Sequence, residues 1–370
     1  MNKKFGLVAL VISALLVSSV SAIASGALEQ PVSKPFQITT DPHYDRNPSL
    51  FQANDGTYWL FFTRACNGGV RGVDGYDPDS DSYDIYYKTA KSLPGLQKAP
   101  EIMVPGSHPD HGQRDVATLQ ASDGRIWVFS STGFGLGENQ IYYFKYYDGS
   151  WQGPVAIDID VQQGKWIGHI DALENDGKIW VFYDAEYSLK AVCYNAGSWH
   201  GPFDIAADAT LGKAIVDNGI FYAVWSYVDP YLNIWGGYIG LSTSGDGETW
   251  INRGQIASWL GATNWDPVLI KDKNTFRLFW APDKGIEGQF IATSKSTNPT
   301  GLSSWSTPVR VTTASYGGNN WWDCWPEPYK KGRGCEGSLC MFYTSERNSD
   351  GTDIIDGNIW MFIAIPLTND

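Results

Sequence analysis

The chain has 370 residues, and 27 lysines and arginines against 40 aspartates and glutamates give it a formal net charge of −13. A surface this acidic repels the phosphates of nucleic acids and of anionic membranes, so neither is an expected partner. Aromatic residues make up 14% of the chain and there are 40 glycines; together with strand-like alternation, these favour an all-β fold over a helical one.

Residues 1–22 have the features of a secretory signal peptide. Two lysines precede an apolar run, and Ala22 ends a small-residue cleavage site. We therefore expect a mature chain, residues 23–370, that is secreted or held at the cell surface, with no membrane insertion after cleavage. A retained N-terminal anchor is the alternative, although the run is short and rich in serine for a membrane span.

The remainder repeats one pattern, in which an apolar strand runs into a short polar turn and then into a strand with aromatic residues. The six copies begin at Asn47 (NPSLFQANDGTYWLFF), Asp115, His169, Lys213, Asp266 and Glu327. Asp-Gly or Asn-Gly between alternating apolar runs predicts a β-hairpin, and a recurrence of roughly 40–50 residues is typical of propeller blades. The last copy is degenerate and carries an insertion in its turn.

We predict one domain, a six-bladed β-propeller of four-stranded antiparallel blades, with five blades as the alternative because of the degenerate copy. The last blade lacks a fourth strand of its own. The segment PFQITT, which begins at Pro35, is expected to supply that strand and close the ring, because closure removes exposed sheet edges.

The five cysteines suit an oxidising compartment. Cys335 and Cys340 flank a turn and are expected to pair with each other, or one of them with Cys324. Cys193, inside the apolar strand LKAVCY, is expected to be a buried thiol. The spacings match no zinc site.

Residues that open the inner strands of a propeller line a shared axial pocket. Glycoside hydrolysis needs paired carboxylates, one to protonate the leaving oxygen and one to activate water or stabilise charge. The candidates for this role are Asp115, Asp171, Asp266 and Glu327. The alternative is that these acids cap backbone amides at strand starts. Side chains expected to hold the substrate are Arg46, Arg114, His169, Trp265 and Trp325. For the two arginines, the alternative is a salt bridge to a neighbouring blade.

A long acidic loop follows the second strand of the first copy. Asp77, Asp79, Asp81 and Asp84 have the alternate spacing with which oxygen ligands can surround a calcium ion. The alternative is a solvated acidic loop over the pocket. No cofactor is expected to be required, and calcium is the one candidate.

The stretch RNPSLFQANDGTYWLFFTR resembles the opening of sialidases, in which Arg-x-Pro starts the first inner strand. SGDGETW, residues 244–250, resembles their Asp-box, a structural turn, one residue short; STNPTGLSSWSTP occupies a similar place without the Asp. The resemblance implies that Arg46 is the first arginine of a carboxylate-binding triad. It also implies an acid/base aspartate among Asp74, Asp77, Asp79 and Asp81, and Tyr343 with Glu327 as nucleophile and partner.

The chain departs from the sialidase pattern where later triad arginines belong, because those positions hold Trp265-Asp266 and Pro326-Glu327. The Asp-Pro openings are similar to arabinanase-type propeller glycosidases, which are five-bladed and use two aspartates and a glutamate with inversion. Both resemblances imply a monomer that acts on an oligo- or polysaccharide as a glycoside hydrolase. The alternatives are a non-catalytic, lectin-like carbohydrate-binding propeller and a scaffold for protein contacts.

Overall fold

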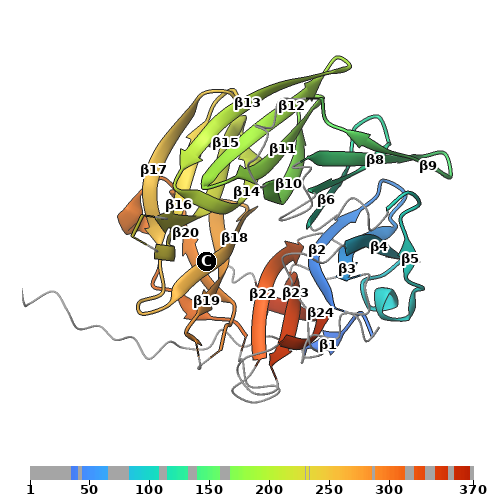
Figure 1. The fold of residues 1–370 in the computed structure, drawn as a ribbon. Helices are drawn as coiled ribbons and strands as arrows, with labels where there is room; N and C mark the ends of the chain where they lie inside the picture. Colours follow the sequence, from blue (N-terminus) through green and yellow to red (C-terminus); the bar gives the residue numbers. More distant parts are fainter. Residues whose placement is uncertain are drawn as a thin grey trace, which may run out of the picture.

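The computed structural model contains six four-stranded antiparallel sheets, which are arranged as blades around a central axis (Figure 1). This is the predicted all-β, six-bladed propeller, and the alternative of five blades is wrong. The structure describes residues 35–40, 44–65, 83–107, 115–131, 140–158, 167–229, 231–232, 234–285, 288–312, 321–329, 338–348 and 354–366.

Blades 1 to 5 each consist of four strands in chain order, and the first strand of each blade lies nearest the axis (Figure 1). Blade 1 comprises β2 (Asp45–Gln52), β3 (Tyr58–Ala65), β4 (Tyr83–Ala90) and β5 (Ile102–Met103). Blade 2 comprises β6 (Asp115–Gln120), β7 (Ile126–Ser131), β8 (Ile141–Tyr147) and β9 (Ser150–Ala156). Blade 3 comprises β10 (Ile167–Asn175), β11 (Lys178–Ala185), β12 (Ser188–Asn195) and β13 (Ser198–Ala207).

Blade 4 comprises β14 (Ala209–Asp217), β15 (Ile220–Asp229), β16 (Ile234–Ser244) and β17 (Trp250–Ala257). Blade 5 comprises β18 (Thr263–Asp272), β19 (Thr275–Asp283), β20 (Ala292–Ser296) and β21 (Val309–Arg310). Blade 6 comprises β22 (Trp321–Tyr329), β23 (Ser338–Asn348), β24 (Ile354–Pro366) and β1 (Phe36–Gln37). Two short 3₁₀ helices are η1 (Pro94–Lys98) and η4 (Leu302–Ser304).

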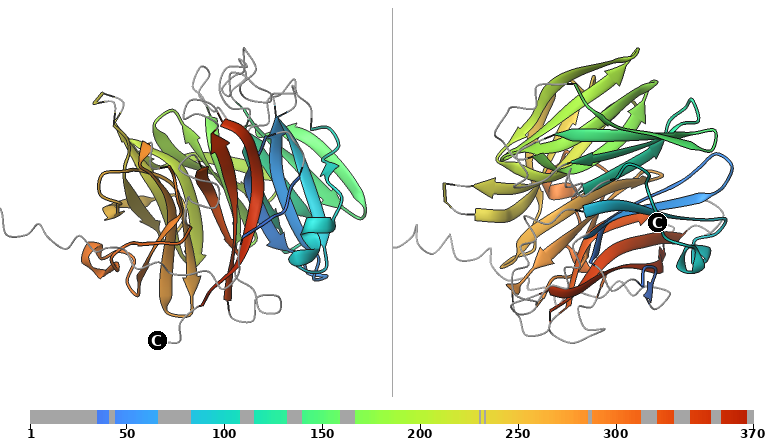
Figure 2. Two further views of the ribbon diagram at one scale, coloured as in Figure 1. Left: turned by 90° about the horizontal axis from the view of Figure 1, so that it is seen from below. Right: turned by 45° about the vertical axis from the view of Figure 1, so that its right-hand side comes forward.

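The hydrophobic core is divided among the junctions between adjacent blades. Figure 2 shows the blades from two further directions. Six clusters of buried apolar side chains each combine residues of two neighbouring blades. Large rings fill them, including Trp127, Trp180 and Trp280, each at most 2% exposed. Because each blade contributes apolar residues on both faces of its sheet, burial requires the complete ring.

A two-residue bulge interrupts the first strand of five blades. The ladder skips two residues in β2, β10, β14, β18 and β22. The first bulged residue is always left-handed, with φ between 45° and 57°, and these residues are Asn47, His169, Leu211, Asp266 and Trp325. In β6 the described ladder is regular, and Asp115 pairs with Ser131. A bulge redirects the side chain of its residues, and here it turns them toward the axis.

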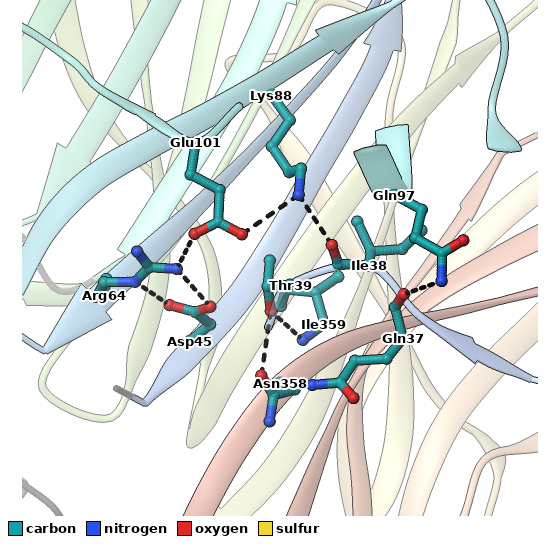
Figure 3. A network of polar contacts seen from close by, with 10 residues as sticks. All are labelled: Gln37, Ile38, Thr39, Asp45, Arg64, Lys88, Gln97, Glu101, Asn358 and Ile359. Carbon is teal, nitrogen blue, oxygen red and sulfur yellow. Dashed lines mark hydrogen bonds and ion pairs between the residues drawn. The ribbon is translucent and has the colours of Figure 1, made fainter. Parts of the chain in front are cut away.

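The N-terminal strand closes the ring as predicted, because β1 pairs with β24 of blade 6 (Phe36 with Met361). Figure 3 shows the polar contacts that attach this segment to blade 1. Lys88 Nζ donates to the carbonyl oxygen of Ile38 (2.9 Å) and lies 3.2 Å from Glu101 Oε1. On the blade 6 side, the Ile359 amide donates to Thr39 Oγ1 (3.0 Å).

The predicted Asp-box forms a turn at the end of β16. Asp246 Oδ1 accepts hydrogen bonds from the amides of Glu248 (2.9 Å) and Thr249 (2.7 Å), and these bonds lower the pKa of Asp246. The Trp250 indole donates to the carbonyl oxygen of Gly247 (2.7 Å). In blade 5 the equivalent turn has Asn298 in place of the aspartate, and Trp305 Nε1 donates to Pro299 (3.1 Å). The turn is therefore structural in both blades.

Cys193 is the buried thiol that was predicted. Cys324 is also a buried thiol outside any disulfide, so the alternative pairing through Cys324 is wrong. The pairing of Cys335 with Cys340 stays a prediction, since Cys335 lies outside the described residues. Among the helices of the described segments, none is long and apolar enough to cross a membrane.

Candidate functional site

The bulged residues of the first strands line a pocket on the axis. Its empty volume is about 450 Å³, part of which is open to solvent. The lining combines charged, amide, imidazole, indole and aliphatic groups from all five bulges and from β6. The residues are Asn47, Pro48, Asp115, Val116, His169, Ile170, Leu211, Gly212, Lys213, Asp266, Trp325 and Pro326. The bulge of every blade that has one is represented.

Three carboxylates in this region link their own blade to the next one through backbone amides. Asp115 Oδ2 accepts from the His169 amide (2.8 Å), and Asp266 Oδ2 accepts from the Trp325 amide (3.3 Å). Asp171 Oδ2 accepts from the Ala214 amide at 2.8 Å. The expectation that acids at strand starts cap backbone amides is therefore confirmed for these three.

Of the two carboxylates in the described lining, Asp115 has more hydrogen-bond and ion-pair partners than Asp266. Asp115 Oδ1 accepts from Asn47 Nδ2 and faces Arg46 Nη2 at 3.4 Å, and its Oδ2 also accepts from Ser131 Oγ at 3.3 Å. The residue is only 3% exposed. These contacts fix Asp115 as the group that positions the pocket walls of blades 1, 2 and 3.

Arg46 lies behind the pocket wall, not in the lining. Its guanidinium stacks over the rings of Tyr83 (4.8 Å) and Trp325 (5.2 Å) and is 4% exposed. These contacts hold the guanidinium of Arg46 against the ring of Trp325. The structure thus gives Arg46 a role in supporting the pocket.

His169 is oriented by a buried carboxylate that the sequence did not suggest. Its Nδ1 lies 2.8 Å from Asp184 Oδ2, and the same oxygen accepts from Thr210 Oγ1 and from the Leu211 amide, both at 2.6 Å. Asp184 has no exposed surface. With Nδ1 directed at Asp184, the imidazole presents its other edge on the pocket side.

Below the bulges, Lys213 of blade 4 binds Glu327 of blade 6. Lys213 Nζ lies 2.8 Å from Glu327 Oε2, and their side chains are 26% and 20% exposed. Asp171 lies close enough for both charges to affect its ionisation, and burial raises the pKa of Asp171 to about 6. Three charged groups from blades 3, 4 and 6 therefore meet at the axis.

Asp266 is the pocket carboxylate best suited to carry a proton. Burial raises its pKa to about 6, against the opposing effect of His169 and the Trp325 amide. Its one hydrogen bond within the described residues uses Oδ2. A carboxyl group that is protonated in mildly acidic solution and lines a pocket can act as a general acid.

The register corrects the alignment of the last blade. Trp325, and not Glu327, occupies the position of Asn47, and Glu327 follows two residues later, as Asp171 follows His169. Among the other predicted residues, Trp265 precedes the bulge of β18, and Tyr343 lies in the cluster between blades 5 and 6, outside the described lining.

Several predicted residues fall on segments that are not described. Arg114, Asp74, Asp77, Asp79 and Asp81 lie outside the described residues. Asp84 is the second residue of β4 and accepts from Ser107 Oγ at 3.4 Å. No group of three possible metal ligands occurs within the described part of the chain, so calcium binding stays a prediction.

Lys213 and Asp184 were not among the predicted site residues, although the sequence holds a signal for each. Lys213 opens the fourth copy, where acids or amides open most of the others. Asp184 occupies a β11 position that holds Thr63, Ser131, Ser226, Ala281 and Thr344 in the other blades. An acid at a position where the other copies have small residues is the signal by which Asp184 could have been predicted.

Comparisons with known proteins find similarity in the fold but not in the sequence. No family model matches the chain, and no curated protein matches it in sequence. A protein of unknown function from Dyadobacter fermentans superposes with a TM-score of 0.65 at 16% identity, over 90% of this chain and 98% of that one. Trypanosoma rangeli sialidase in complex with sialic acid superposes with a TM-score of 0.58 at 10% identity, over 87% of this chain and 54% of the sialidase.

The chain has the propeller fold of the sialidases. An α-L-arabinofuranosidase from Lactobacillus brevis is more distant, with a TM-score of 0.48 at 14% identity over 85% of this chain and 90% of that one. The similarity to the sialidases is limited to the fold. The described lining of the pocket contains no arginine, and Lys213 is the one lysine in it.

Proposed function

We propose that the protein binds glycans in the axial pocket and cleaves a glycosidic bond there. The observation that carries this proposal is the contrast between two carboxyl groups at the axis. Burial raises the pKa of Asp266 to about 6, whereas Glu327 has its charge balanced by Lys213 at 2.8 Å. Glycoside hydrolysis uses two carboxyl groups, one that donates a proton to the leaving oxygen and one that activates water or stabilises charge.

In this mechanism Asp266 is the proton donor. Its proton passes to the glycosidic oxygen as the bond from that oxygen to the anomeric carbon breaks. Glu327, which lies under the pocket lining, takes a proton from a water molecule as the oxygen of that water bonds to the anomeric carbon, so the bond lost to the leaving oxygen is replaced. The faces of Trp325 and the nearby prolines offer apolar surface to the C–H groups of a pyranose or furanose ring.

A second candidate function is carbohydrate binding without turnover. It is favoured by the amide contacts of Asp115, Asp171 and Asp266. In each of them, one carboxylate oxygen accepts a hydrogen bond from a backbone amide of the next blade. In this case the pocket would hold a sugar through Asn47, His169 and Trp325, and the acids would only maintain its shape.

A panel of aryl-glycosides and polysaccharides that includes a sialoside and arabinan tests the proposal, with and without calcium. Hydrolysis by the wild type that is lost in Asp266→Asn and in Glu327→Gln supports the hydrolase, because both variants keep the size and the acceptor oxygen of the original side chain. Measurable glycan binding with no turnover on any substrate contradicts hydrolysis and supports the second function. A dependence on calcium would support the predicted site at Asp77, Asp79, Asp81 and Asp84.

A further inference from the structure

Two neighbouring blade junctions carry the same group of four aromatic rings. The first cage, between blades 1 and 2, consists of Trp59, Tyr87, Tyr146 and Trp151. The second cage, between blades 2 and 3, consists of Trp127, Tyr143, Tyr194 and Trp199. The β-ladders put these residues in equivalent places, because Tyr146 pairs with Trp151 as Tyr194 pairs with Trp199.

The rings are arranged alike in the two cages. In the first cage, Trp59 lies 5.3 Å from both Tyr87 and Tyr146, and Trp151 lies 5.7 Å and 5.1 Å from the same two rings. The corresponding centroid distances in the second cage are 5.3, 5.2, 6.0 and 5.2 Å. The two junctions are therefore copies of one structural unit.

The second cage is filled by a cation of the chain itself. The ammonium group of Lys145 lies 3.9 Å from the ring centroid of Trp127, 4.9 Å from Tyr143 and 5.4 Å from Tyr194. Burial among these rings lowers the pKa of Lys145. Trp127 is 2% exposed. An ammonium group against several ring faces is the arrangement that cation–π attraction favours.

Among the described residues, no cation takes the corresponding place in the first cage. Thr89 pairs with Trp59 in the place where Lys145 pairs with Trp127, and a threonine side chain is too short to reach over the indole. Lys91, which directly follows the end of β4, is bound instead to Asp55 Oδ2 (3.1 Å) and Thr57 Oγ1 (2.7 Å). The four rings of the first cage are only partly buried.

We propose that the first cage is a binding site for an alkylammonium group supplied by another molecule, such as a lysine side chain or a quaternary ammonium headgroup. The chain uses Lys145 in this way at the next junction, and a net charge of −13 attracts cations to the surface. Trp59 is the second residue of β3, directly after the turn that ends β2. The cage therefore lies toward the opposite end of blade 1 from the axial pocket.

Calorimetric titration of the wild-type protein with tetramethylammonium and with n-butylammonium tests the proposal, and 3,3-dimethylbutan-1-ol serves as the neutral control of similar shape. We expect one saturable site that prefers the cations over the alcohol by about tenfold, which corresponds to ~1.4 kcal/mol of attraction. The butylammonium and tetramethylammonium arms separate a lysine-like from a quaternary ligand.

Two variants locate the site. Thr89→Lys should fill the first cage as Lys145 fills the second and abolish binding, whereas Lys145→Thr should open the second cage and raise the stoichiometry to two sites. Circular dichroism confirms that each variant is folded, and Lys145→Thr still tests the idea if Thr89→Lys does not fold. The proposal is overturned if the alcohol binds as well as the cations, if the wild type binds neither cation, or if neither substitution changes binding.

Discussion

Lys213 of blade 4 and Glu327 of blade 6 form an ion pair, with Nζ 2.8 Å from Oε2, although blade 5 lies between their blades in the ring. The pair spans the axis below the pocket and joins strands that share no β-ladder. Asp171 lies beside it and is partly buried. The floor of the pocket is therefore a charged contact, and the walls are the bulges above it.

Lys213→Met is expected to destabilise the fold, because it leaves Glu327 and Asp171 without a cation in a largely buried place. Loss of one partner of such a pair costs about 1–3 kcal/mol in the free energy of unfolding. Urea denaturation measures this change. In the double variant Lys213→Met/Glu327→Gln part of the loss should be recovered, and strictly additive effects of the two substitutions would contradict the contact.

The raised pKa of Asp266 predicts how stability depends on pH. The folded state keeps the proton up to about pH 6, whereas the unfolded state releases it near 3.8, the ordinary pKa of an aspartate side chain. The contribution of this group to stability is therefore lost as the pH rises from about 4 through about 6. Asp266→Asn keeps an acceptor for the Trp325 amide but cannot ionise. The stability of the variant relative to the wild type should therefore increase over this range and level off above it, as followed by urea midpoints at each pH. A difference that stays constant with pH would contradict the assignment.

The fold could be predicted because its signals are local. Each hairpin turn and each alternating strand lies within one short stretch, and the free edge of the last blade pointed to the segment that begins at Pro35. The pocket could be predicted in part, since Asn47, Asp115 and His169 open their copies and lie where the repeat put them.

The rest of the site depends on contacts between blades, which no single copy reveals. Asp171 and Glu327 follow the left-handed residue of their strand by two positions, where the ladder resumes after the bulge. Their side chains therefore lie under the pocket lining and not in it. The roles of Asp184 and Lys213 are set by partners 27 and 114 residues away along the chain. Spacing within a repeat carries no information about such pairs.

Gly247 of the Asp-box is expected to tolerate no side chain. It has φ +80°, and a Cβ atom there would lie 2.5 Å from the Trp180 ring of blade 3. Gly247→Ala should lower the free energy of unfolding by roughly 2–4 kcal/mol, from backbone strain together with overpacking. Gly254→Ala is the matched control, because φ is +78° but nothing lies within 4 Å, so only the strain of about 1–2 kcal/mol applies. Equal losses in urea denaturation would contradict the packing argument.

Lys88 is expected to hold the closing strand. It is 2% exposed and donates to the carbonyl oxygen of Ile38, whereas the side chain of Lys91 is 71% exposed. Lys88→Met should cost about 1–3 kcal/mol and speed hydrogen exchange of the Ile38 amide, which bonds to Ile359 across the closure. Lys91→Met should change stability by less than about 1 kcal/mol. Unchanged exchange in Lys88→Met would show that the β1–β24 ladder alone closes the ring.

The measurement that tests the central claim most directly is glycan binding by the purified protein on a glycan array, compared between the wild type and Trp325→Ala. If the axial pocket receives a sugar, the wild type binds at least one glycan, and the variant, while still folded, binds it about tenfold more weakly, because the indole supplies apolar surface to the ring. Absence of binding to every glycan, or equal binding by a folded Trp325→Ala variant, would contradict a glycan site on the axis.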